Sequence, residues 1–435
     1  MPKENKPLSE AGRKKLYKNF GAMIEDCCPL LEKRVIIFRA MQELTCSNEL
    51  LNRYKLLLEV HLTVLYSIIE VAIVMRADLR SKKNAEKREN LKYLVFVIHE
   101  FYKSLFHGRE GKSVWNQMKE ILATIKDKCL TDQLSSIEDN IQSYKDKYFN
   151  QNSKDMRDTF VHYDDNVLKL YKAIVNVNEE ELTQMVISFL AITTPINQLL
   201  QRVLLFCDIV EQNDPMFKAS AREDMFRNTL KDTQTQLDSK LIHFTQSLDQ
   251  IMRLCSRLEQ LVANKTLGLN DDAITQIKDT TDLSKLDVLT HFFYIDICVA
   301  MKGYLCAESR IESLWHLTRM YLIIYEAHKI LFAREEHSLW NKLIRKPLDS
   351  ETKNAKDLVM VEANMNAIMQ DKVVENVRQA YVHIRQGKKF RLTNLMTFMA
   401  ELDTVSILDK SLLFIKMLTK LLTLSKDAIN FLVKE

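Results

Sequence analysis

Two short segments of the chain each place an arginine and a histidine with four residues between them. The first runs Arg157-Asp158-Thr159-Phe160-Val161-His162, and the second runs Arg378-Gln379-Ala380-Tyr381-Val382-His383. Histidine changes its protonation state near neutral pH, so it can act as a general base or a general acid. Arginine keeps its charge and presents a planar fork of N–H donors that suits a phosphate group. Two such pairs would supply a base, an acid and two phosphate contacts without a metal ion.

The two segments occupy equivalent places in an internal repeat. Residues 70–106 align with residues 296–332 without a gap, and a Ser-x-Trp-Asn sequence follows in both copies, at Ser113 and at Ser338. The Arg/His segments come next in both copies. The aligned helices share identical residues at Met75/Met301, Leu79/Leu305, Glu86/Glu312, Leu91/Leu317, Ile98/Ile324, Glu100/Glu326, Lys103/Lys329, Leu105/Leu331 and Phe106/Phe332. This order predicts that one helical domain was duplicated.

The composition favours helices throughout the chain. Only 7 Gly and 6 Pro occur among 435 residues, too few for the turns and bulges of a β-protein. We therefore expect an all-α fold, with two tandem antiparallel helical-bundle domains that form a pseudo-dimer. The turn signal Asn213-Asp214-Pro215 separates a first domain over 1–213 from a second over 216–435. The spacing predicts helices over about 10–26 with a break at Pro29, over 48–79, over 91–106, and after 178 with a bend or interruption at Pro195.

Here the sequence resembles the HEPN superfamily, small α-helical domains found in many bacterial ribonucleases and defence proteins. Their motif is an arginine, a polar residue, a few further residues and a histidine, so Asp158 fits well and Gln379 fits less well. In that family two domains pack so that both motifs line one cleft. The resemblance implies metal-independent RNA cleavage, with Arg157, His162, Arg378 and His383 as catalytic residues and no cofactor. The protein would be an endoribonuclease, such as a toxin or an antiviral effector.

Other residues near the segments are candidates for supporting roles. Asp158 and Gln379 follow the arginines, and Tyr163 and Tyr381 would line the cleft or pack in the core. Lys388, Lys389 and Arg391 form a basic cluster that could hold the RNA backbone, or could simply be a charged helix end. RNA is the expected partner, and an antitoxin or regulatory protein and a second copy of the chain are further candidates.

The net charge and the cysteines restrict the class of protein and the cellular compartment that we expect. The net charge is +4, from 62 basic and 58 acidic residues, which is not the strongly basic balance of a nucleic-acid coat protein. Eight cysteines occur without a C-x-x-C pair, as in a reducing compartment, so we expect a cytoplasmic protein without a metal site. The apolar run Leu56–Met75 contains Glu59, His61 and Glu70, which favours a buried core helix over a membrane span.

Each candidate functional residue also has a purely structural interpretation. A histidine on a helix is more often a packed residue than a catalyst, and Arg310 with His316 fits a relaxed form of the pattern without a counterpart in the first copy. Glu100 and Glu326 would serve structural pairs, and Trp115 and Trp340 packing. The alternative function is therefore a non-catalytic helical scaffold or regulatory module that retains the HEPN fold.

Overall fold

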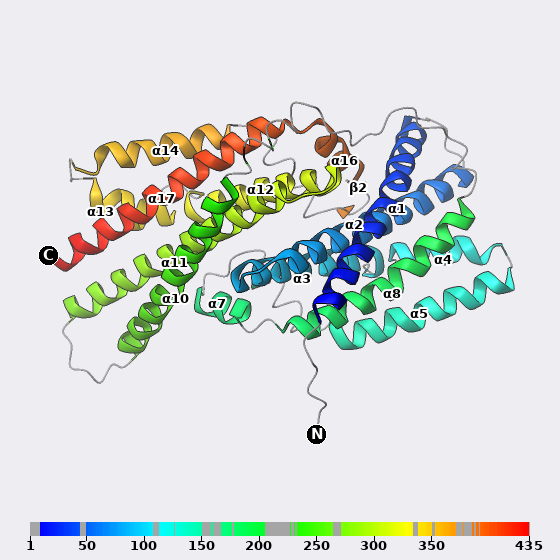
Figure 1. Ribbon diagram of the computed structural model, residues 1–435, viewed down its shortest axis with the longest axis horizontal. Coiled ribbons are helices and arrows are strands. Elements are labelled where there is room, and N and C mark those ends of the chain that lie inside the picture. The colour runs from blue at the N-terminus through cyan, green and yellow to red at the C-terminus, as the bar shows by residue number, and fades with distance from the viewer. Residues whose placement is uncertain are drawn as a thin grey trace, which may run out of the picture. The chain divides into compact units, whose positions relative to one another are not determined.

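The structure is a computed structural model, and the residues that it describes are almost all helical (Figure 1). The described residues confirm the all-α class. They contain one small exception, a hairpin in which β1 (Arg385–Gln386) pairs antiparallel with β2 (Lys389–Phe390). The described residues are 9–43, 49–107, 113–125, 127–149, 158–159, 167–175, 178–204, 227, 230, 233–263, 271–333, 338–349, 353–370, 377, 385–386, 389–390 and 392–434.

The chain divides into two compact units. Unit 1 comprises Met1–Val161, Ile174–Lys218 and Tyr381–Ala400, and unit 2 comprises His162–Ala173, Ala219–Ala380 and Glu401–Glu435. The main division at Lys218 lies close to the turn expected at 213–215. Two segments depart from the expected contiguous domains over 1–213 and 216–435. Residues 162–173 belong to unit 2, and residues 381–400 belong to unit 1.

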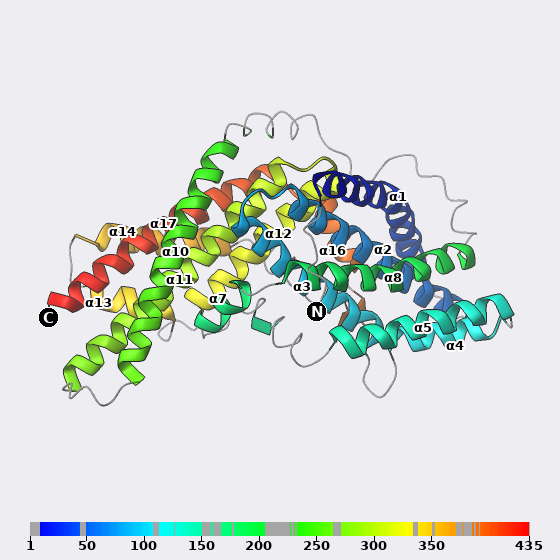
Figure 2. The ribbon, with the colours of Figure 1, turned by 60° about the horizontal axis from the view of Figure 1, so that its bottom comes forward.

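Unit 1 is organised around one apolar helix. That helix, α2 (Glu49–Arg80), packs on α1, α3, α4 and α8, and α5 packs on α8 and α4 (Figure 2). Nearly every side chain from Leu57 to Ala77 on α2 is buried, which matches the continuous apolar pattern of this stretch. The other helices of this unit are α1 (Glu10–Glu43), α3 (Asn84–Phe106), α4 (Val114–Ala123), α5 (Lys128–Tyr148) and α8 (Glu179–Val203).

Helix α16 (Leu392–Glu401) completes unit 1 from far along the chain. The hydroxyl of Tyr66 on α2 lies 3.7 Å from the sulfur of Met399, and Nη2 of Arg39 on α1 donates to the Thr393 carbonyl at 3.4 Å. Leu395, Met396 and Met399 are fully buried. The core of unit 1 therefore depends on a segment that the sequence assigns to the second domain.

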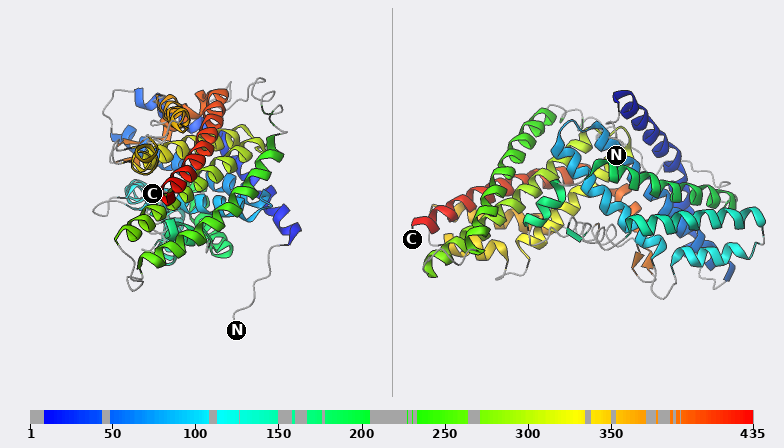
Figure 3. Two further views of the ribbon diagram at one scale, coloured as in Figure 1. Left: turned by 90° about the vertical axis from the view of Figure 1, so that its left-hand side faces the viewer. Right: turned by 90° about the horizontal axis from the view of Figure 1, so that it is seen from below.

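Unit 2 repeats this packing order. Its central helix, α11 (Asp271–Leu305), packs on α10, α12 and α17, and α14 packs on α17 (Figure 3). Most of helix α7 (Val167–Val175) also belongs to this unit, and the hydroxyl of Tyr171 donates to Oδ1 of Asp249 at 2.7 Å. The remaining elements are α10 (Thr233–Ala263), α12 (Arg310–Leu331), the π-helix η5 (Asn341–Arg345), α13 (Lys346–Leu348), α14 (Ala355–Met369) and α17 (Thr404–Lys434).

The two units share helix order, packing partners and local caps. The helices α1, α2, α3, α5 and α8 pack on one another in the same pairs as α10, α11, α12, α14 and α17, in that order. In both copies the serine of the Ser-x-Trp-Asn sequence accepts the asparagine backbone N–H at 3.1 Å, Ser113 from Asn116 and Ser338 from Asn341. The duplication stays a prediction, and this shared order supports it.

The expected break at Pro29 is wrong, because α1 runs unbroken from Glu10 to Glu43. Proline costs one helical hydrogen bond and clashes with the carbonyl four residues earlier. Here Cys27, Leu31 and Val35 on both sides of the proline are buried, and α1 packs along α2. That packing outweighs the local cost. Helix α8 likewise continues through Pro195.

Gly303 on α11 makes room for the imidazole of His316 on α12. A Cβ built on Gly303 would lie 2.1 Å from Cε1 of His316, far inside van der Waals contact. We expect Gly303→Ala to lower the free energy of unfolding by about 1–3 kcal/mol, the usual cost of overpacking a core. Urea unfolding followed by circular dichroism measures this.

A matched control lies in unit 1. A Cβ built on Gly21 of α1 would meet only ordinary contacts, the nearest being Cζ of Arg76 at 3.6 Å. Gly21→Ala should therefore leave stability unchanged or raise it by up to about 1 kcal/mol, since alanine favours helix. A loss in Gly21→Ala as large as that in Gly303→Ala would remove the steric explanation.

Candidate functional site

The predicted catalytic segments are only partly among the described residues. Asp158 and Thr159, next to Arg157, are helical, and Thr159 is buried while Asp158 is half-buried. Asp158 takes part in contacts of its own, so it is not a free surface charge. Outside the described residues lie Arg157, His162, Tyr163, Arg378, Gln379, Tyr381 and His383.

Both segments lie where the chain passes from one unit to the other. Thr159 belongs to unit 1 and Val167 to unit 2, so the first passage falls between them. Val377 belongs to unit 2 and Arg385 to unit 1, which places the second passage between those two residues. The sequence gives no hint of these passages, because they are fixed by long-range packing.

The basic cluster near the second segment is partly described. Lys389 lies in strand β2 and pairs with Gln386. This part of the cluster is therefore a strand of a hairpin, and not the charged helix end that was the structural alternative. Lys388 and Arg391 lie outside the described residues.

Two other arginine–histidine combinations in the described chain are core features. His316, the relaxed match to the motif, is fully buried with its ring 4.9 Å from that of Trp315. It packs against Gly303, and its burial fits the sequence interpretation that this match to the motif arose by chance.

The second combination was not predicted. Nε of Arg34 on α1 donates to Nδ1 of His61 on α2 at 3.2 Å, and Nε2 of His61 lies 2.9 Å from Oδ1 of Asn197 on α8. With Nδ1 accepting, Nε2 carries the proton and donates to the amide oxygen. Arg34 and His61 are 0% exposed, so no substrate reaches them. The chain of contacts ties three helices together, and its only sequence signal was a histidine inside the apolar run of α2.

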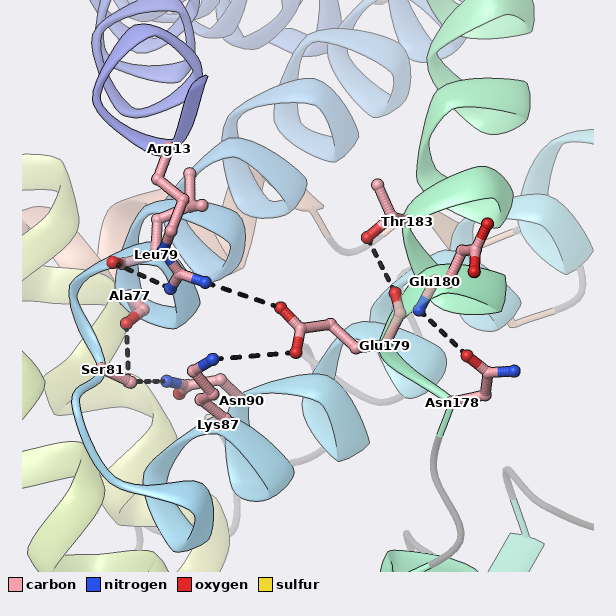
Figure 4. A network of polar contacts seen from close by, with 10 residues as sticks. All are labelled: Arg13, Ala77, Leu79, Ser81, Lys87, Asn90, Asn178, Glu179, Glu180 and Thr183. Carbon is pink, nitrogen blue, oxygen red and sulfur yellow. Dashed lines mark hydrogen bonds and ion pairs between the residues drawn. The ribbon is translucent and has the colours of Figure 1, made fainter. Parts of the chain in front are cut away.

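A polar network joins four helices of unit 1 (Figure 4). The carboxylate of Glu179, in the first turn of α8, lies 3.7 Å from Nη1 of Arg13 and 3.7 Å from Nζ of Lys87. Nη2 of Arg13 also donates to the carbonyl of Leu79 near the end of α2 at 3.2 Å. The placement suits helix dipoles, with a carboxylate at a helix start and a cation at a helix end.

Beside this network lies Asp78, which is only 3% exposed. The pKa of its carboxyl is raised from 3.8 to about 7, first by burial and then by the charge of Glu179, while Lys87 and Arg13 act in the opposite direction. A carboxyl that titrates near neutral pH is a feature of many functional sites and also of structural ion-pair networks. Here the neighbours are helix-joining ion pairs, which favours a structural role.

The raised pKa gives a pH-dependent stability. Because the folded state holds the proton more tightly than the unfolded state, the contribution is complete below pH 4 and is lost as pH rises through about 7. Asparagine mimics the neutral carboxyl. We therefore expect the stability difference between Asp78→Asn and wild type to move in favour of the variant between pH 5 and pH 8, by an amount on the order of a few kcal/mol. Thermal unfolding at both pH values tests this, and an equal difference at the two would contradict it.

Two helical windows, within Leu51–Arg80 and Ala273–Leu305, are long and apolar enough to cross a membrane. They lie in α2 and α11, the central helices of the two units, and 94% and 89% of the windows are buried inside the structure. Such burial is typical of core helices. Among the described residues, no group of three or more His, Cys, Asp or Glu side chains is placed to hold a metal ion.

No protein-family model matches the chain, and no curated protein or solved structure matches it.

Proposed function

We propose that this chain is a metal-independent endoribonuclease in which the two Arg/His segments act together on one scissile bond. The observation that carries the proposal is the position of both segments at the passages of the chain between the two units, as their described neighbours Thr159, Val167, Val377 and Arg385 indicate. Twin segments at equivalent places in two similarly packed units are what a tandem nuclease requires.

The reaction follows from the side chains. One histidine, His162 or His383, takes the proton of a ribose 2′-OH, and the 2′-oxygen attacks the adjacent phosphorus. The bond from phosphorus to the 5′-oxygen breaks, and the other histidine gives that oxygen its proton. Arg157 and Arg378 stabilise the charge that grows on the phosphate oxygens. The products are a 2′,3′-cyclic phosphate and a 5′-hydroxyl, and no metal takes part.

The remaining expectations belong to the same proposal. Asp158 and Gln379 would orient the arginines, Tyr163 and Tyr381 would line the site, and Lys388, Lys389 and Arg391 would hold the RNA backbone through their charge. The protein would act in the cytoplasm as a toxin or antiviral effector, held in check by an antitoxin or another regulatory protein. Cys27, Cys255 and Cys298 are buried thiols, in keeping with a reducing compartment, whereas Cys129 is exposed.

The deciding experiment is cleavage of total RNA by the purified full chain in EDTA, with analysis of the product ends. We expect fragments that carry 2′,3′-cyclic phosphate and 5′-hydroxyl ends. Absence of cleavage over a range of RNA substrates, or products with 3′-hydroxyl ends, would contradict the proposal and favour the non-catalytic scaffold.

A further inference from the structure

Unit 2 contains a pocket of about 360 Å³ between α12, η5 and α14. This volume lies in the range of small-molecule sites. The exposed Asn366 and the half-buried Phe332 and Glu362 open it to solvent. The lining residues are His328, Phe332, Ala333, Ser338, Trp340, Asn341, Glu362, Met365 and Asn366.

One side of the pocket is aromatic. The rings of His328 and Phe332 are nearly parallel, with centroids 6.4 Å apart and 12° between their planes. The ring of Trp340 lies 5.5 Å from that of Phe332. The half-buried rings of His328 and Phe332 offer a surface on which a planar heterocycle can stack, and the buried Trp340, tilted 35° from Phe332, supports Phe332 from behind. Burial lowers the pKa of His328 below its usual 6.5, which favours the neutral imidazole.

The other side carries a positioned carboxylate on α14. The indole Nε1 of Trp340 donates to Oε1 of Glu362 at 3.0 Å, and Nε of Arg345 lies 3.1 Å from the same oxygen. Both contacts use Oε1, and they fix the carboxylate so that Oε2 can accept N–H groups from a ligand. Asn341 and Asn366 line the pocket as well and add amide donors and acceptors.

The helix that forms part of the wall has an unusual local conformation. Residues Asn341–Arg345 form a π-helix, whereas the matched stretch of the first copy lies in the α-helix α4, Val114–Ala123. π-Helical turns occur frequently at functional sites. This one follows Trp340 directly and supplies both Asn341 and Arg345.

The equivalent region of unit 1 is filled by aromatic rings. His328 aligns with Tyr102, whose ring stacks on Tyr144 at 4.9 Å and lies 4.5 Å from the ring of Phe149. The matched Phe106 and Trp115 complete that cluster, with ring centroids 5.9 Å apart. Unit 2 keeps the Phe and Trp but replaces the tyrosine by histidine and leaves open space. This difference between matched positions falls at the pocket and supports a ligand site in unit 2.

We propose that this pocket binds a nucleobase, with the base stacked on Phe332 and the Glu362 carboxylate accepting its N–H donors. Guanine fits best, because it presents two adjacent donors, N1–H and the amino group, to Oε2, the oxygen that the contacts of Trp340 and Arg345 leave to accept them. The proposal is independent of the cleavage chemistry, since it uses none of the Arg/His residues. The base can come from a free nucleotide or from an RNA strand, and the experiment separates these sources.

The test measures binding of GMP, AMP, CMP and UMP to the full chain by titration calorimetry, with short G-containing and G-free RNA oligonucleotides as further arms. We expect saturable binding of GMP that is tighter than binding of the other three nucleotides. Binding of the G-containing oligonucleotide alone would identify an RNA strand as the source. The His162→Ala/His383→Ala variant should bind equally well, so a failed nuclease assay and a failed binding assay remain distinct.

Two pocket variants and one control decide the assignment. Glu362→Gln should weaken binding by about tenfold to a hundredfold, the usual effect of losing a charge-assisted hydrogen bond, and Phe332→Ala should weaken binding of all bases that stack. Glu401→Gln, an exposed carboxylate on α16, should bind like wild type. Thermal unfolding verifies that Glu362→Gln is folded. Equal binding by folded Glu362→Gln and wild type, or no binding of any nucleotide or oligonucleotide, would overturn the proposal.

Discussion

Alanine at His162 or at His383 is expected to lower the rate of RNA cleavage in EDTA by about 10²–10⁴-fold. This is the usual contribution of one positioned general acid or base. If the two histidines serve one reaction as base and acid, each single variant removes one proton transfer. The double variant should then lose little more than the worse single variant, because groups that act as a unit are not additive. Single-turnover rates on a fluorescent RNA measure all three.

A histidine away from the segments serves as the control. His243 on α10 is exposed, and His243→Ala should cleave at the wild-type rate. Circular dichroism and thermal unfolding must show that the His162 and His383 variants remain folded. Retention of full activity by the double variant would assign any cleavage to a contaminating nuclease or to other residues.

Removing one partner of the buried ion pair in unit 2 should have the second large effect. Nη2 of Arg319 on α12 lies 3.5 Å from Oδ1 of Asp296 on α11, and their side chains are 1% and 2% exposed. Asp296→Ala removes the carboxylate of this pair and leaves the guanidinium buried. We expect a loss of about 3–5 kcal/mol in the free energy of unfolding, measured by urea titration.

A double variant and an exposed ion pair serve as controls for the effect of Asp296→Ala. Replacing both charges, as in Asp296→Leu with Arg319→Met, should be less harmful than Asp296→Ala, because neither charge of this pair then remains buried. The exposed pair of Glu49 and Arg53 has a shorter distance, 2.7 Å, yet Glu49→Ala should cost under about 1 kcal/mol. A loss in Asp296→Ala no larger than that in Glu49→Ala would contradict the burial argument.

The sequence predicts the helices of this protein better than it predicts their contacts. The apolar run of α2 predicted a helix that ends at residue 79, one residue before its observed end at Arg80, and the amphipathic pattern of α3 predicted its observed end at Phe106. The break expected at Pro29 was wrong because local propensity was weighed without the packing of α1 on α2. That packing depends on residues far away in sequence.

Some candidate sites were likewise visible in the sequence, whereas others depend on contacts between distant helices. The repeat brought the two Arg/His segments to notice, because it compares positions within one chain. The contact of Arg34 with His61 and Asn197 was missed, since three separate helices must pack before it exists. The pocket of unit 2 was missed for a related reason. The change from Tyr102 to His328 is visible in the repeat. In unit 1, however, the space beside Tyr102 is filled by the rings of Tyr144 on α5 and of Phe149, and the sequence does not show that these rings meet there.

Because α16 packs in unit 1, that unit cannot finish folding until the ribosome has synthesised most of the chain. A ribosome makes α1 to α8 long before it reaches Leu392–Glu401, so the nascent chain carries an uncovered apolar surface around Tyr66 during most of its synthesis. A gene cut at the turn over 213–215 would encode a first fragment without α16 and a second fragment without α7. Neither fragment would be self-sufficient, and the two would have to be made together to restore a folded molecule.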